Sequence, residues 1–486
     1  MKYASRLVVL ALIASASPKA MAASATPEEA QRLAGLIESY LGKTPGVVAV
    51  AVNGDGYDLV IDAAPFFKTL ESQGNSASLS PLRYHLTDQG GGKWLVTLDQ
   101  RLDFSLSIEK QLQFKGSVGN YKSTGIFSAE MGAFESGHTS VADMTFVEDV
   151  TAPGQAPVHV DAAVKSLEAV SSASFSLAGG LDGSVTLTAG GFSENIDMPA
   201  PEGSAMPVHV ALTGGGMSET ISYSGLKWLE AWQIAGWFKD HPTEAAVKTG
   251  HAELAALMRK ALPVFGSIKI DASMDNLEAG TVLGTFGAKA MRAGLVMNGA
   301  VADGLFGESL AVEGLTMPPG IVPPFANDIA PLSASIGFKV TDFDLAAPAK
   351  LLLDHLEKTS DDPSPEMQQQ LQSALMPKGE VKITLDPGSL VSKALTVDYQ
   401  GSMMAGVGTK PSGEAVVKAK GLDELIKILQ AAPVEMGLEQ GIYGILAAKG
   451  FGKTEADGAI TWKAEMTREG AVTVNGVPMP GTGGAQ

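Results

Sequence analysis

Three short runs in this sequence stand in the order that serine enzymes of the penicillin-binding type use for acyl transfer. They are a Ser-x-x-Lys run from Ser107 to Lys110, a Ser-x-Asn run from Ser193 to Asn195, and Lys248-Thr249-Gly250. That chemistry needs the nucleophilic serine at the start of a helix and the Lys-Thr-Gly run on a strand. The surrounding pattern predicts the opposite, because Ser107 lies within an alternating strand and Lys248 within a helical run. We therefore expect no acyl-transfer site here.

The histidines are the other side chains that could do chemistry. His159 and His209 each follow a Pro-Val pair at the start of a predicted strand, so neighbouring strands could bring the two imidazoles together. A metal site there would lack a cysteine and an obvious carboxylate, which favours polar residues on alternating strands. Patterns for a zinc-protease helix, a nucleophile elbow, a phosphate-binding loop and an EF-hand loop are absent from the sequence. The sequence predicts no catalytic, metal or cofactor-binding residue, and no cofactor.

The first residues predict export. Lys2 and Arg6 precede an apolar run at residues 7–14, and Ala20-Met21-Ala22 has the small-x-small pattern that signal peptidase cleaves. We expect residues 1–22 to be a signal peptide and the mature chain to begin at Ala23 in the periplasm. No later apolar run reaches the ~18 residues that a transmembrane helix needs.

Composition narrows the chemistry and the partners. The chain of 486 residues has no cysteine, which excludes disulfides, thiolate metal sites and cysteine nucleophiles. Its formal net charge is −18, and the sequence has no basic cluster. Nucleic acid and anionic lipid headgroups are therefore not expected as partners attracted by charge.

Residues 79–221 carry the pattern of long strands. Leu102, Phe104 and Leu106 share one parity while Arg101 and Ser105 occupy the other, which predicts a strand with one polar face. Glycine-rich turn signals recur between such runs, so the strands are expected to follow one another as an antiparallel meander.

Four strands are predicted to lead directly into helices, at junctions near Asp62, Gly225, Asp344 and Gly421. The similarity among them is short, and we interpret it as shared architecture. The expected blocks are residues 23–224, β-rich with short helices; 225–262, helical; 263–376, a β block ending in helices; and 377–486, a strand, helix and hairpin.

The predicted fold class is β-rich α+β, an extended twisted antiparallel sheet with helices packed on one face that leaves room for an open groove. Three tryptophans, Trp228, Trp232 and Trp237, fall on one predicted helix. Such a cluster can contact a membrane or a partner, but the flanking charges give no basic face, which favours core packing.

Both ends of the chain carry a family resemblance. Residues 36–42, 45–48 and 56–57 near the start, and residues 420–425, 436–449, 457–462 and 474–478 near the end, resemble a family of secreted alphaproteobacterial proteins known only as a domain of unknown function. The ending is also distantly similar to the YdgA-like envelope proteins. The resemblance implies an envelope location and a shared architecture, and it carries over no catalytic or ligand residue.

These features predict a noncatalytic envelope protein that binds an apolar ligand such as a lipid, or a partner protein. Two alternatives stay open: a hydrolase-type enzyme whose site is not recognisable from sequence, and a purely structural or assembly factor. An apolar cavity would favour the first hypothesis, and a pocket of strongly shifted carboxylates or histidines would favour an enzyme.

Overall fold

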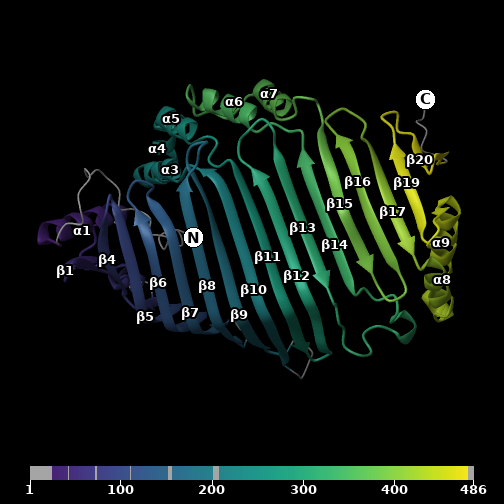
Figure 1. Cartoon of the computed structure of the whole chain (residues 1–486), viewed down its shortest axis with the longest axis horizontal. Coiled ribbons are helices and arrows are strands. Elements are labelled where there is room, and N and C mark those ends of the chain that lie inside the picture. Colours follow the sequence, from purple (N-terminus) through teal and green to yellow (C-terminus); the bar gives the residue numbers. More distant parts are fainter. Residues whose placement is uncertain are drawn as a thin grey trace. The chain divides into compact units, whose positions relative to one another are not determined.

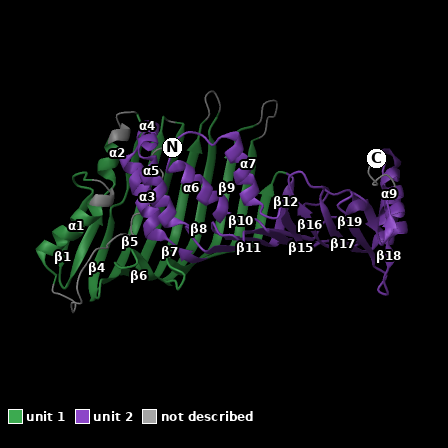
Figure 2. Ribbon diagram, turned by 90° about the horizontal axis from the view of Figure 1, so that it is seen from above, with its two compact units in different colours: residues 1–222, 274–282 green, residues 223–273, 283–486 purple. Residues whose placement is uncertain are grey.

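A computed structural model describes residues 25–41, 43–71, 74–109, 111–151, 156–200 and 207–479. The expected signal peptide lies outside these residues. The chain divides into two compact units, residues 1–222 with 274–282 and residues 223–273 with 283–486 (Figure 2). Each unit is built on antiparallel strand pairs, so the β-rich, antiparallel prediction is confirmed.

The first unit begins with short elements and continues with long strands. Its elements are α1 Pro27–Leu41, β1 Val48–Asn53, β2 Gly56–Ile61, α2 Ala64–Glu71, β3 Ser76–Leu79, β4 Leu82–Gly90, β5 Lys93–Ile108, β6 Leu112–Ser128, β7 Ala133–Val150, β8 Val158–Phe175 and β9 Leu181–Met198. β10 Val208–Leu226 and β11 Ser267–Thr281 contribute residues to both units. From β5 to β9 each strand pairs with the next, as the predicted meander requires (Figure 1).

The core of the first unit forms where α1 packs on the sheet. Leu33 of α1 is fully buried in one apolar cluster with Leu59, Leu86, Trp94 and Phe127 from β2, β4, β5 and β6. Burying an aliphatic or aromatic side chain of this size contributes about 1.5–3 kcal/mol. This cluster therefore fixes α1 on the part of the sheet that β2, β4, β5 and β6 form.

A row of irregular residues crosses the long strands. Tyr121 of β6 pairs with Gln100 of β5 and Val118 pairs with Leu102, so β6 carries one extra residue between these pairs. Further along, Asp143 of β7 has φ +53°, and Gly191 of β9 also has φ +53°. The extra residue of β6 changes the parity of the residues that face one side of that strand.

The predicted parity of β5 can be tested by placing a charge on each face. Phe104 lies within ring distance of Phe114 and Phe146, with centroids 5.6 and 6.1 Å apart, whereas the Ser105 hydroxyl meets the Ser78 hydroxyl at 2.7 Å. Phe104→Asp or Leu106→Asp should destabilise the protein by about 3 kcal/mol, and Ser105→Asp by less than about 1 kcal/mol. Chemical denaturation measures both, and equal losses on the two faces would contradict this parity.

The second unit alternates strands and helices. Its elements are α3 Trp228–Asp240, α4 Glu244–Thr249, α5 His251–Ala261, β12 Gly284–Asn298, β13 Leu305–Glu313, η2 Pro324–Ala326, β14 Ser333–Thr341, α6 Ala346–Leu356, α7 Pro365–Leu375, β15 Val381–Val391, β16 Thr396–Ala405, β17 Ser412–Lys420, α8 Leu422–Gln430, η3 Val434–Met436, α9 Glu439–Phe451, β18 Lys453–Thr454, β19 Ile460–Met466, β20 Val472–Val474 and β21 Val477–Pro478. Strands β12 to β17 pair in chain order, and β19 then pairs with β17.

All four predicted strand-to-helix junctions occur in the structure. The carboxylates of Asp62 and Asp344 each accept a hydrogen bond of 2.9 Å from a backbone N–H at the start of the following helix. At the last junction, Gly421 has φ +98° and precedes α8. The carboxylates of Asp62 and Asp344 thus satisfy N–H donors that the first turn of a helix leaves unpaired.

The tryptophans of α3 are buried or half-buried. Trp237 is buried and stacks on His241, with ring centroids 3.9 Å apart, while Trp228 and Trp232 meet edge to face at 5.5 Å. Core packing, the favoured interpretation, is therefore correct for Trp237, whereas Trp228 and Trp232 are partly buried.

Candidate functional site

The structure gives each residue of the acyl-transfer pattern a secondary structure that can be compared with the one this chemistry needs. Ser107 lies on β5, paired with Gln113, and Ser193 lies on β9, four strands further along. Lys248 lies on α4, where its ammonium pairs with the Glu244 carboxylate at 2.8 Å. Since Ser107 does not open a helix and Lys248 is not on a strand, the pattern carries no acyl-transfer chemistry.

The two repeated histidines lie in one row of paired residues that crosses four strands. His159 of β8 pairs directly with Asp197 of β9, and with Asp149 of β7 on its other side. The His159 Nδ1 lies 2.7 Å from the Asp149 carboxylate, and the His209 Nδ1 lies 2.8 Å from the Asp197 carboxylate. Our interpretation that these histidines lack an obvious carboxylate was wrong.

Sequence reasoning missed these carboxylates because they come from neighbouring strands. A signal was present: an aspartate precedes each histidine by about one hairpin loop, at Asp149 before His159 and Asp197 before His209. The row is nevertheless open to solvent, and its His side chains are 38% and 57% exposed. Among the residues that the structure describes, no group of three or more His, Asp or Glu side chains is arranged to hold a metal ion.

The row should instead show a local pH dependence. Hydrogen bonds to Asp149 and then Asp161 raise the pKa of His159 above its ordinary value near 6.5, while Asp197 faces it from β9. The stabilisation from protonated His159 is present below the unfolded-state pKa and is lost as pH rises through the folded-state pKa. An NMR titration of wild type and Asp149→Asn should show a pKa nearer 6.5 in the variant. An unchanged pKa in the variant would contradict this interaction.

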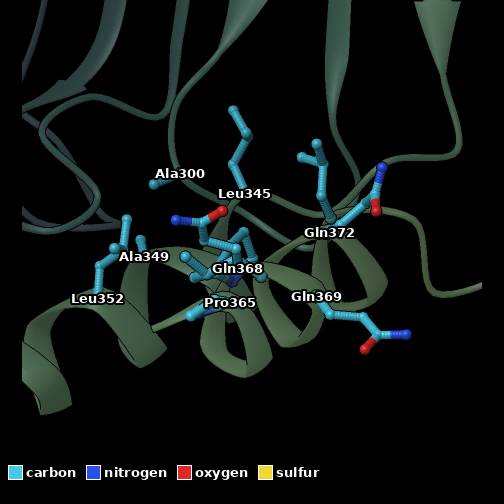
Figure 3. Close-up of a pocket in the computed structure, with 11 residues that line it drawn as sticks. Ala300, Leu345, Ala349, Leu352, Pro365, Gln368, Gln369 and Gln372 are labelled. Atoms are coloured by element: carbon cyan, nitrogen blue, oxygen red, sulfur yellow. The ribbon is translucent and has the colours of Figure 1, made fainter. Parts of the chain in front are cut away.

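An open groove lies between α6 and α7 in the second unit (Figure 3). Its volume is about 850 Å³. Apolar side chains form most of its lining, together with three glutamines: Ala300, Leu345, Pro348, Ala349, Leu352, Pro365, Leu371, Leu375, Gln368, Gln369 and Gln372. The volume falls in the range of about 300–1,000 Å³ that is usual for small-molecule sites.

Backbone hydrogen bonds hold the two walls of the groove. The Asp344 N–H donates to the Leu375 carbonyl at 2.9 Å, which joins the start of α6 to the end of α7. The Leu345 N–H donates to the Val301 carbonyl at 3.0 Å, which fixes the strand connection beside Ala300. α7 begins at Pro365, and the Ser364 hydroxyl caps it by accepting from the Met367 N–H.

The lining of the groove carries no ionisable side chain. Its polar groups are carboxamides, and that of Gln368 donates to the Pro363 carbonyl at 3.2 Å. Lys350 follows the lining residue Ala349 in the sequence, and its ammonium pairs with the Asp354 carboxylate at 2.8 Å. A carboxamide does not transfer protons near neutral pH, so this arrangement suits binding of an apolar group and offers no acid or base.

Sequence reasoning described both helices but did not group these residues. Leu345, Ala349 and Leu352 follow one helical stripe, and Gln368, Leu371, Gln372 and Leu375 follow another. The two stripes face each other only because residues 357–364 reverse the chain between α6 and α7. There the Thr359 hydroxyl donates to the Asp361 carboxylate at 2.8 Å.

A second, polar cavity of about 420 Å³ lies at the bulge of β15. Pro387 interrupts the pairing of β15 with β14, and the Tyr399 hydroxyl donates to the Ser335 carbonyl at 2.6 Å across the gap. Lys418, which lines this cavity, pairs with the Asp457 carboxylate at 3.2 Å. The tyrosine thus closes the bulge structurally.

In comparisons with family models, curated proteins and solved structures, nothing matches this chain. Within the described ranges, no helix has the length and apolar character needed to cross a membrane. The groove between α6 and α7 is the candidate functional site of this chain.

Proposed function

We propose that this chain is a noncatalytic, exported envelope protein that binds an apolar molecule such as a lipid in the groove between α6 and α7. The observation that carries the proposal is the lining, in which apolar side chains surround the space and the polar groups are uncharged amides. Sites of this kind bind ligands mainly by burying apolar surface.

The expected ligand is a molecule with an acyl chain. Each methylene group removed from water contributes about 0.8 kcal/mol, so eight buried methylenes would contribute about 6 kcal/mol before the entropic costs of binding. Leu352 on α6 is 43% exposed at the groove, which leaves apolar surface for such a chain to cover. Location in the periplasm, expected from residues 1–22, would place the protein beside a lipid source.

The test uses a neutral dye that fluoresces in apolar surroundings. Folded mature protein should bind N-phenylnaphthylamine, and a phospholipid or fatty acid should displace the dye. Leu352→Asp should weaken binding at least about tenfold, because it places a charge on the apolar wall. The matched control is Leu310→Asp on β13, where the leucine is 52% exposed in the same unit but outside the groove.

Three outcomes would count against this function. Folded protein that binds no dye would favour a structural or assembly role. Equal losses in the two aspartate variants would place the dye elsewhere. Slow turnover of the added lipid would favour the alternative of a hydrolase-type enzyme.

A further inference from the structure

Helix α9 is apolar around most of its circumference yet lies at the surface. Its sequence EQGIYGILAAKGF buries Ile442 alone, whereas Tyr443 is 69% and Phe451 is 38% exposed. A helix that is hydrophobic on all sides is normally buried. At 13 residues it is also too short to span a bilayer.

α9 is held firmly on the edge of the second unit, beside α8 and β19 (Figure 1). The Trp462 indole N–H donates to the Ala448 carbonyl at 2.7 Å, and the Asn475 carboxamide donates to the Phe451 carbonyl at 2.8 Å. The face with Ile442 is therefore turned toward the unit, and the opposite face is presented on a fixed support.

The outward face carries a second stripe, which is mostly apolar. Gln440, Tyr443, Gly444, Ala447 and Phe451 have the spacing i, i+3, i+4, i+7 and i+11, which places them on one side of the helix, and all five are exposed. This spacing is the one by which a helix packs against another helix. The stripe carries no side chain that is charged near neutral pH, so burying it would leave no unpaired charge.

The stripe has large and small residues in positions that complement each other. Tyr443 and Phe451 lie four residues before and four residues after Ala447. A Cβ atom added at Gly444 or at Gly450 would have no neighbour within 4 Å, so both glycines are open recesses. In an antiparallel pair of such helices with a two-fold axis at Ala447, Tyr443 of one copy faces Gly450 of the other, and Phe451 faces Gly444.

We propose that a second copy of this chain binds here, forming a two-fold symmetric dimer through antiparallel packing of α9 on α9. The aromatic side chains of each copy fill the glycine recesses of the other, and the small residues let the two helices approach closely. A lipid surface fits less well. Glu435, Glu439 and Glu455 flank the stripe, and the Lys449 ammonium is already paired with the Asp423 carboxylate.

The chain has no cysteine, so single-cysteine variants of the mature protein test the axis directly. Ala447→Cys should form a disulfide-linked dimer when a copper–phenanthroline oxidant is added, because the two copies of this residue meet on the axis. Ala448→Cys, one position further and about 100° around the helix, should cross-link at least about tenfold less. Equal cross-linking of the two variants would overturn the proposal.

Sedimentation of the same protein tests the recesses. Gly444→Trp should weaken dimerisation at least about tenfold by filling the recess that receives Phe451. Gly441→Trp is the matched control, because this glycine is equally open but lies off the stripe. A monomer at all concentrations, or a dimer that survives Gly444→Trp, would overturn the proposal. So would a monomer whose binding to phosphatidylcholine vesicles is lost in Gly444→Trp, since that outcome would assign the stripe to a bilayer.

Discussion

Replacing Phe127 by alanine should lower the free energy of unfolding of the first unit by about 3–5 kcal/mol. Phe127 is 1% exposed and meets Phe134 edge to face, with ring centroids 5.4 Å apart. It lies in the cluster that joins α1 to the sheet, together with Leu33 and Leu86. The substitution removes the ring from a close-packed site and leaves a cavity that neighbouring side chains fill only in part.

The matched control is Phe175→Ala at the end of β8, where the ring is 55% exposed. We expect a loss below about 1 kcal/mol there, because little apolar area returns to water. Native-state hydrogen exchange of α1 and β5 amides measures the first unit separately. Similar losses of protection in the two variants would show that α1 does not pack on Phe127.

Local patterns predicted much of the strand structure. The alternation of Leu102, Phe104 and Leu106 identified β5, because side chains of a strand point to opposite faces in turn. The last hairpin turns at Asn475 and Gly476, a typical hairpin pair, and both residues have positive φ, +50° and +80°. Such signals depend on neighbouring residues alone, so a sequence reveals them.

Features that depend on pairing between distant residues were not predicted. The extra residue of β6 between Val118 and Tyr121 becomes visible only once the register with β5 is known. The carboxylate of Asp197 meets His209 for the same reason, because the two residues approach only when β9 and β10 pair. The spacing of Asp197 and His209 across one loop is a signal that the two strands pair, but it does not fix their register.

The groove was not predicted either, because it depends on how the helices α6 and α7 pack together. Leu352 on α6 and Leu375 on α7 line one space because the chain reverses between the helices and the Asp344 N–H bonds to the Leu375 carbonyl. Periodicity predicts each apolar stripe separately. It does not say which stripe remains uncovered, and that is the property on which ligand binding depends.

Replacing Gly421 by alanine should destabilise the second unit by about 4 kcal/mol or more, one of the largest effects expected for a single substitution. Gly421 joins β17 to α8 with φ +98°, a conformation that residues with a Cβ atom rarely adopt. An added Cβ would lie 1.9 Å from the carbonyl oxygen of Ala394, which is backbone and cannot rotate away. The strand or the helix must therefore move.

Gly437→Ala separates the two causes of that loss. Gly437 also has a positive φ, +62°, but a Cβ atom there would have no neighbour within 4 Å. Its cost should be that of the backbone conformation alone, about 1–2 kcal/mol. Denaturant titration of both variants gives the difference, which is the contribution of the contact with Ala394. If the two substitutions lower the free energy of unfolding equally, α8 does not begin against the Ala394 carbonyl. The close junction between β17 and α8 described above would then be contradicted.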